Sequence, residues 1–192
     1  MTLRALLILP AALACLAAAP APAQKAPAQK APATKAPATK VPAAKAAPLT
    51  GPFDATNPQA LMDLLSQAGA KVQTGRREAD AVFVAVSSPA ASFSMQFAGC
   101  NPQGRACRAV LLDGQLERVP ATSAQINGFN QTSVMCRLYQ DKAGLPHILY
   151  SAILFKTMSR EDASTHLFAW QGCLADARDF MRDPVAYLAN AA

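Results

Sequence analysis

The sequence lacks the short motifs that identify most hydrolases, phosphate-binding proteins and zinc enzymes. It contains no Gly-x-Ser-x-Gly, no glycine-rich phosphate loop and no His-Glu-x-x-His. Cys-x-x-Cys, the spacing typical of redox-active thiols, is also absent. The two histidines, His147 and His166, have no closely spaced cysteine pair to complete a zinc site, so we expect both to be hydrogen-bonded or solvated. The sequence therefore predicts no catalytic residue, no cofactor and no metal, and favours a protein that is not an enzyme.

A long hydrophobic run is missing as well. The most apolar segment, residues 5–16, is shorter than the ~18 to 20 residues of a membrane-spanning helix, and Pro10 interrupts it. Arg4 precedes this segment, and a small-x-small tripeptide ending at Ala23 follows it. We predict a signal peptide over residues 1–23, cleaved after Ala23, and therefore a periplasmic or secreted bacterial protein without a transmembrane anchor.

Acidic residues are absent before Asp54, whereas lysine recurs at every fifth position of a repeat rich in lysine, alanine and proline. The repeat, residues 24–52, has no apolar face to bury, and its prolines favour polyproline II. We predict a disordered linker. Two interpretations stay open, a solubilising spacer and a basic tether that contacts anionic envelope surfaces. The repeated lysines are Lys25, Lys30, Lys35, Lys40 and Lys45.

The formal net charge of +6 comes from this N-terminal part of the chain. Arg4 and the five repeat lysines supply the excess, so basic and acidic residues balance from residue 53 onward. A basic face on the folded domain is what nucleic-acid binding would need. We therefore expect no nucleic-acid partner.

The predicted compartment favours disulfide bonds, because an even number of cysteines in an oxidising environment usually pairs. Four remain after cleavage of the signal peptide. Cys100 and Cys107 close a short loop between two predicted strands, and a bridge there would stabilise the domain by about 2.5 kcal/mol. For Cys136 and Cys173, a second bridge and two buried thiols both stay open. Cys15 leaves lipidation open, although the residues before it match a lipobox poorly.

Residues 53–192 have the length of one domain and alternate between helix and strand patterns. Capping residues and apolar periodicity predict three helices, at residues 57–69, 122–131 and 159–183. Apolar runs and period-two alternation predict strands at residues 71–74, 81–86, 92–97, 106–112, 134–140 and 148–155. We expect residues 81–86 to be buried on both faces, and turns at residues 76–80 and at Asp113-Gly114. This order predicts an α+β fold, an antiparallel sheet flanked by helices.

Several stretches carry a family resemblance. They are residues 93–99, residues 100–111, Ile126-Asn127-Gly128-Phe129-Asn130, the turn Gly144-Leu145-Pro146, and the C-terminal helix with Trp170. Together they resemble the YbjN-domain family, whose members are described as bacterial sensory transduction regulators. The resemblance covers residues 57–181. It implies a fold similar to type III secretion chaperones, homodimerisation by analogy with that fold, and no known catalytic residue.

We interpret the chain as an exported binding or regulatory domain that holds a protein or peptide partner on its sheet face or at a sheet edge. A periplasmic enzyme with an unrecognised site and a structural envelope protein with a basic tether are the alternatives. Arg76, Arg77, Arg105 and Arg108 are either a candidate anion patch or scattered surface charges.

Overall fold

Six antiparallel strands form one sheet in the order β1-β2-β3-β4-β6-β5. A computed structural model describes residues 52–117 and 121–191 of the chain. Along the chain the elements are α1 (Pro58–Gln67), β1 (Lys71–Arg77), β2 (Ala81–Ser87), β3 (Ser92–Ala98), β4 (Ala109–Gln115), α2 (Ser123–Thr132), β5 (Cys136–Gln140), β6 (Pro146–Ile153), α3 (Arg160–Arg182) and α4 (Pro184–Asn190). The predicted α+β class with an antiparallel sheet is confirmed.

The predicted signal peptide, its cleavage site after Ala23, Cys15 and all of the linker except Pro52 lie outside the described residues. The similarity to type III secretion chaperones stays a prediction. Although α3 has 23 residues, neither it nor any other helix in the described part of the chain is apolar enough to span a membrane.

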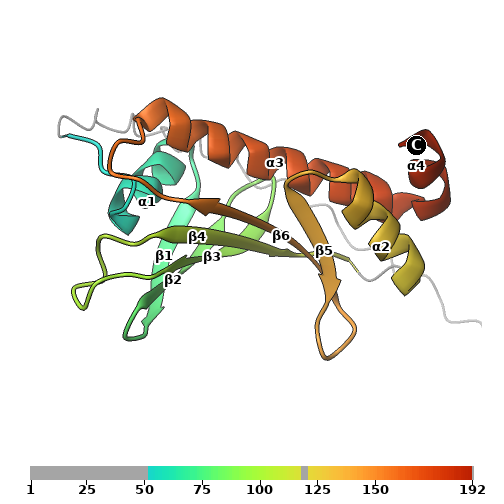
Figure 1. The fold of residues 1–192 in the computed structure, drawn as a ribbon, viewed down its shortest axis with the longest axis horizontal. Helices are drawn as coiled ribbons and strands as arrows, with labels where there is room; N and C mark the ends of the chain where they lie inside the picture. Colours follow the sequence, from blue (N-terminus) through green and yellow to red (C-terminus); the bar gives the residue numbers. More distant parts are fainter. Residues whose placement is uncertain (1–51, 118–120, 192) are drawn as a thin grey trace, which may run out of the picture. The chain divides into compact units, whose positions relative to one another are not determined.

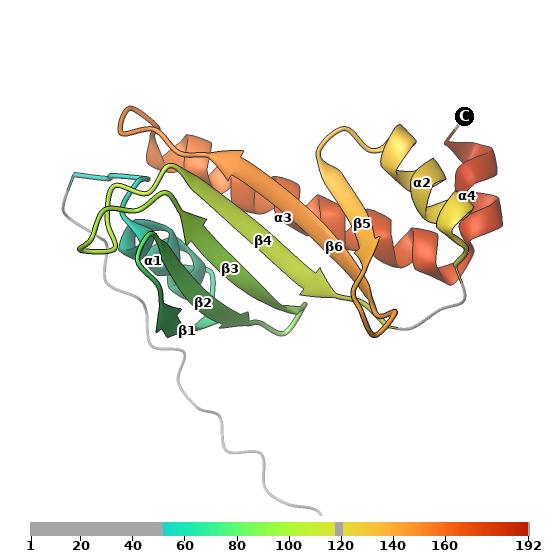
Figure 2. The same cartoon turned by 60° about the horizontal axis from the view of Figure 1, so that its bottom comes forward.

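The helices pack on one face of the sheet (Figure 1). The long α3 runs across the strands, α1 contacts β1, and α2 contacts β5 and α4 at the other end. The opposite face carries no helix of the described residues, as the turned view shows (Figure 2). This second face is open to solvent.

The core lies between the sheet and α3. Alternate residues of each strand point toward the helices, as the strand pleat requires. The largest fully buried side chains are Trp170, Phe97, Phe129, Phe180, Leu61, Met95, Leu112 and Ile148. The expectation that residues 81–86 are buried on both faces is wrong, because Ala85 on the open face is exposed.

The predicted turn at Asp113-Gly114 is also wrong. β4 runs straight through both residues, and Gly114 faces α3. A β-carbon at Gly114 would lie 3.2 Å from ring carbons of Trp170 and from Leu174. Glycine is favoured here by close packing against α3 rather than by a turn.

The ends of several elements differ from the sequence prediction, among them β4 (predicted at 106–112), β5 (134–140) and β6 (148–155). β1 continues to Arg77, so the predicted turn at residues 76–80 shortens to Glu78–Asp80. Asp183-Pro184 ends α3 as expected, but it also starts α4, because Asp183 accepts a hydrogen bond from the Ala186 amide and proline occupies the first turn. In α2, Gly128 lets Leu188 of α4 approach to 3.0 Å from where a β-carbon would be.

Two disulfides link parts of the sheet to their surroundings. Cys100 and Cys107 are joined across the β3–β4 loop, and Cys136 of β5 is joined to Cys173 of α3. Of the two alternatives that the sequence leaves open for Cys136 and Cys173, the structure has the bridge.

Two glycines provide a matched test of the packing. We expect Gly114→Ala to destabilise the fold by about 1–3 kcal/mol, because the new methyl group overlaps Trp170 and Leu174. Gly172→Ala, on α3 with no atom within 4 Å of the new β-carbon, should instead stabilise by up to about 1 kcal/mol. Urea unfolding of both variants measures this, and equal effects would contradict the packing at Gly114.

The two disulfides should differ in their contribution to stability. The bridged residues are separated by 37 positions in Cys136–Cys173 and by 7 in Cys100–Cys107. Chain entropy predicts a loss of about 4 kcal/mol for Cys136→Ala with Cys173→Ala, against about 2.5 kcal/mol for the other pair. Unfolding of the two double variants tests the ranking, and an equal or reversed order would refute it.

Candidate functional site

The two edge strands of the sheet, β1 and β5, differ in how their outward backbone groups are bonded. An edge strand normally presents a row of free N–H and C=O groups that can pair with another chain. In an antiparallel sheet, alternate residues direct both groups to the same side of the strand. The edges can therefore be compared group by group.

The β5 edge is closed by its own neighbourhood. The Asp141 amide donates to Leu145 O at 2.9 Å, so odd-numbered residues of β5 face β6 and even-numbered residues face outward. Asn130 of α2 meets the outward groups of Leu138: its Oδ1 accepts from the Leu138 amide at 2.7 Å, and its Nδ2 donates to Leu138 O at 2.9 Å. One side chain thus replaces a neighbouring strand at this position.

The next outward residue of β5, Cys136, is bonded as well. Its amide donates to Ser133 Oγ at 3.1 Å, and its carbonyl accepts from Arg137 Nη1 at 2.7 Å. The outward groups of both Leu138 and Cys136 are therefore taken by side chains.

The β1 edge has no such closure. Ser88 donates its amide to Ala91 O across the β2–β3 turn, so the odd-numbered residues of β2 face β1. Lys71 and Gln73 of β1 pair with two of those residues, which leaves the amides and carbonyls of Val72 and Thr74 directed outward. No hydrogen bond from the described residues reaches these four groups.

The rest of β1 is also accessible. Every residue of β1 except Val72 is exposed. A bulge between Thr74 and Arg77 ends the regular pairing with β2, and Thr74 Oγ1 contacts Met62 of α1. The usable edge is therefore the first half of the strand.

A hollow of about 640 Å³ on the open face adjoins this edge. It extends from Lys71 and Gln73 on β1 across the middle strands to His147 on β6. Ser94 and Gln115 also line it. We call it the open-face groove, and most of the residues that line it have polar side chains.

A hydrogen-bonded cluster closes the far end of the open-face groove. Asp113 accepts from the Tyr139 hydroxyl at 2.5 Å and pairs with His147 Nδ1 at 2.7 Å. His147 Nε2 lies 3.8 Å from Asp141, and its ring stacks on Tyr139. Burial raises the pKa of Tyr139 to about 12, and the hydrogen bond to Asp113 and the charges of both aspartates add to this. The cluster fixes the β5–β6 hairpin to β4.

His166 is hydrogen-bonded too, since its Nδ1 lies 2.6 Å from the Tyr150 hydroxyl. Burial raises the pKa of Tyr150. Neither His147 nor His166 belongs to a group of three or more metal-ligating side chains within residues 52–117 and 121–191.

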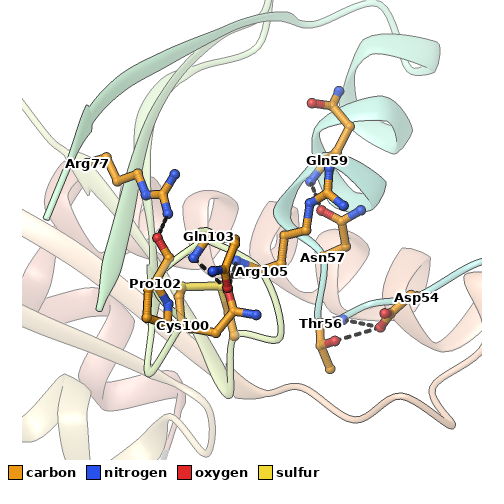
Figure 3. Close-up of a disulfide and its surroundings, with 11 residues drawn as sticks. Asp54, Thr56, Asn57, Gln59, Arg77, Cys100, Pro102, Gln103 and Arg105 are labelled. Atoms are coloured by element: carbon orange, nitrogen blue, oxygen red, sulfur yellow. Dashed lines mark hydrogen bonds between the residues drawn. A yellow bond between two sulfur atoms is a disulfide. The ribbon is translucent and has the colours of Figure 1, made fainter. Parts of the chain in front are cut away.

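The four arginines of the candidate anion patch make different contacts. Arg76 pairs with Glu78 and lies over the ring of Phe83, with its guanidinium carbon 4.2 Å from the centroid. Arg77 donates to the carbonyl of Pro102 in the disulfide loop, and Arg105 extends from that loop toward the start of α1 (Figure 3). A single anion site built from all four stays a prediction.

The disulfide loop is held by hydrogen bonds of its own. Asn101 Oδ1 accepts the amides of Gln103 and Arg105 at 3.1 and 2.9 Å (Figure 3). The Cys107 amide donates to Thr56 O at 2.8 Å, which ties the loop to the segment before α1. The loop, α1 and the bulged end of β1 therefore form one packed corner.

The chain matches no protein-family model, no curated protein and no solved structure among those with which it was compared. The resemblance to the YbjN-domain family accordingly stays a prediction.

The role of Asn130 was missed by sequence reasoning. In the sequence, Asn130 stands out only as the last position of the Ile-Asn-Gly-Phe-Asn stretch. The sequence feature that could indicate this role is an amide side chain in the last turn of a helix that connects within a few residues to a short strand. Which backbone groups it meets depends on the angle between α2 and β5, which the local sequence does not specify.

Asn130→Ala should open the β5 edge. We expect a loss of about 1–3 kcal/mol, because the Leu138 amide and carbonyl lose their partners, and concentration-dependent self-association through the freed edge. Asn127→Ala, an exposed change on the same helix, is the control and should stay within about 0.5 kcal/mol of the original chain. Urea unfolding and light scattering measure the two effects. A monomeric Asn130→Ala protein of unchanged stability would show that Asn130 does not close the edge.

Proposed function

We propose that this protein is an exported, non-catalytic binding domain that takes an extended segment of a protein partner as an additional strand beside β1. One observation carries the proposal: the outward groups of Cys136 and Leu138 on β5 are bonded by side chains, whereas those of Val72 and Thr74 on β1 are free of bonds from the described residues. Strand addition uses such groups for affinity and the flanking side chains for specificity.

The Tyr139–Asp113–His147 cluster supports binding rather than catalysis. Both oxygens of Asp113 are hydrogen-bonded within the cluster, and both nitrogens of His147 face carboxylates. A histidine that activates a nucleophile needs a hydroxyl or thiol within hydrogen-bond reach. No described residue presents one to His147, so its contacts serve to hold the hairpin.

Export and regulation complete the proposal. The signal pattern and the two disulfides support a periplasmic or secreted location, where the bridges stay oxidised. The resemblance to the YbjN-domain family supports a regulatory role, in which the linker lets the domain reach its partner. In this proposal, any homodimer forms through surfaces other than the β1 edge.

Proline substitutions at the two edges test strand addition in cells. A photoreactive benzoylphenylalanine replaces exposed Gln73 beside the β1 edge, in the full-length chain and in two variants of it. Thr74→Pro removes an outward amide and should abolish the crosslinked adduct. Gln140→Pro makes the same change at the outward amide of β5, and the adduct should persist.

As a control, circular dichroism and urea unfolding test whether both proline variants are folded. An adduct that survives Thr74→Pro at the same yield as Gln140→Pro would rule out strand addition at β1. The complete absence of an adduct at Gln73 would rule it out as well.

A further inference from the structure

We infer that the segment added to β1 is acidic, with Asp or Glu side chains on the side that faces the open-face groove. This inference rests on the proposed function and names the chemistry of its partner. It follows from the charges along β1, from the groove beside it, and from the failure of the two other candidate strands that this chain itself could supply.

Basic side chains dominate β1. The strand carries Lys71, Arg76 and Arg77 and no acidic residue. Lys71 forms no ion pair with the described residues, and the pair between Arg76 and Glu78 is largely exposed, so it is weak and can be exchanged. The outer strand of the sheet therefore presents positive charge to a neighbour.

The groove determines which side chains of the added strand contact this protein. In paired strands, directly opposed side chains lie on the same face, with β-carbons about 4.5–5.5 Å apart. Residues opposite Lys71 and Gln73 would therefore project onto the open face, where the groove begins. A carboxylate there can pair with the Lys71 ammonium and accept from the Gln73 amide.

A second copy of the chain fits this edge poorly. Pairing with a second copy would place two strands that carry the same three basic residues side by side, and in the antiparallel register centred on Thr74 it places Lys71 opposite Arg77 twice. Like charges directly opposite each other destabilise a strand pair. The bulge after Thr74 further limits the length over which two such strands can pair.

The linker of the same chain fits it no better. Its repeats contain lysine as their only charged residue, so it would add positive charge to a basic edge. Its prolines lack the amide that an added strand must donate. An acidic segment from another protein remains as the occupant that the edge and its charges favour.

Three peptides test the inference against the mature chain, residues 24–192. Each is a capped, fluorescently labelled strand of about eight residues, the usual strand length. The first alternates Val with Glu, the second replaces every Glu by Gln, and the third is the Glu peptide with N-methyl groups on alternate amides. Fluorescence anisotropy measures their dissociation constants.

We expect the Glu peptide to bind about tenfold more tightly than the Gln peptide, and the N-methylated peptide not to bind. Lys71→Glu should remove the preference for Glu over Gln. Lys142→Glu, the same charge change in the β5–β6 turn, is the matched control and should preserve it.

The outcomes separate the two proposals. Equal binding of the Glu and Gln peptides, with none for the N-methylated one, would overturn the acidic partner and leave strand addition standing. Equal binding of the Glu and N-methylated peptides would overturn strand addition at β1. A preference for Glu that persists in Lys71→Glu would overturn the assignment of Lys71, and an absence of binding by all three would overturn the inference altogether.

Discussion

Every outward amide and carbonyl of an edge strand has to be bonded to protein or to water, and this requirement shapes both ends of the sheet. At β5 the protein meets it internally at two of the three outward residues, because Asn130 bonds Leu138 while Ser133 and Arg137 bond Cys136. At β1 no described residue bonds the outward groups of Val72 and Thr74, so water or a partner has to do so. An edge bonded only to water can exchange that water for another strand at little cost, whereas an edge bonded by an asparagine cannot.

The closed edge depends on tertiary packing behind it. Asn130 is held in place because its neighbour Phe129 is buried against Phe180 of α3 and Tyr187 of α4, with ring centroids 5.2 and 5.7 Å apart. The Cys136–Cys173 bridge fixes β5 to α3 beside it. At the other end, β1 is bonded on one side to β2 and touches α1, without a covalent link of its own. The two ends therefore differ in covalent attachment as well as in hydrogen bonding.

Local signals predicted the elements well, and contacts between distant segments account for what they missed. Thr122 and Ser159 form the capping boxes that mark the starts of α2 and α3, and period-two alternation marks β3. Asp113-Gly114 reads as a turn because nothing nearby in the sequence reveals that Trp170 lies over Gly114. The same holds for Asn130, because its partner Leu138 lies eight residues away on another element, and the local sequence does not specify how α2 and β5 are oriented.

Charge is divided between the two parts of the chain in a way that bears on the β1 edge. The net excess of +6 lies before residue 53, while the part from residue 53 onward is balanced overall, with three basic residues and no acidic residue on β1. The lysine repeat and this edge have the same sign of charge, so in our proposal the repeat is a poor competitor for the outward groups of Val72 and Thr74. An acidic segment is attracted to both, and long-range attraction of this kind raises the rate of encounter more than the lifetime of the complex. In the complex that we propose, specificity then comes from the short-range pairing along β1, where backbone bonds and the Lys71 ammonium act together.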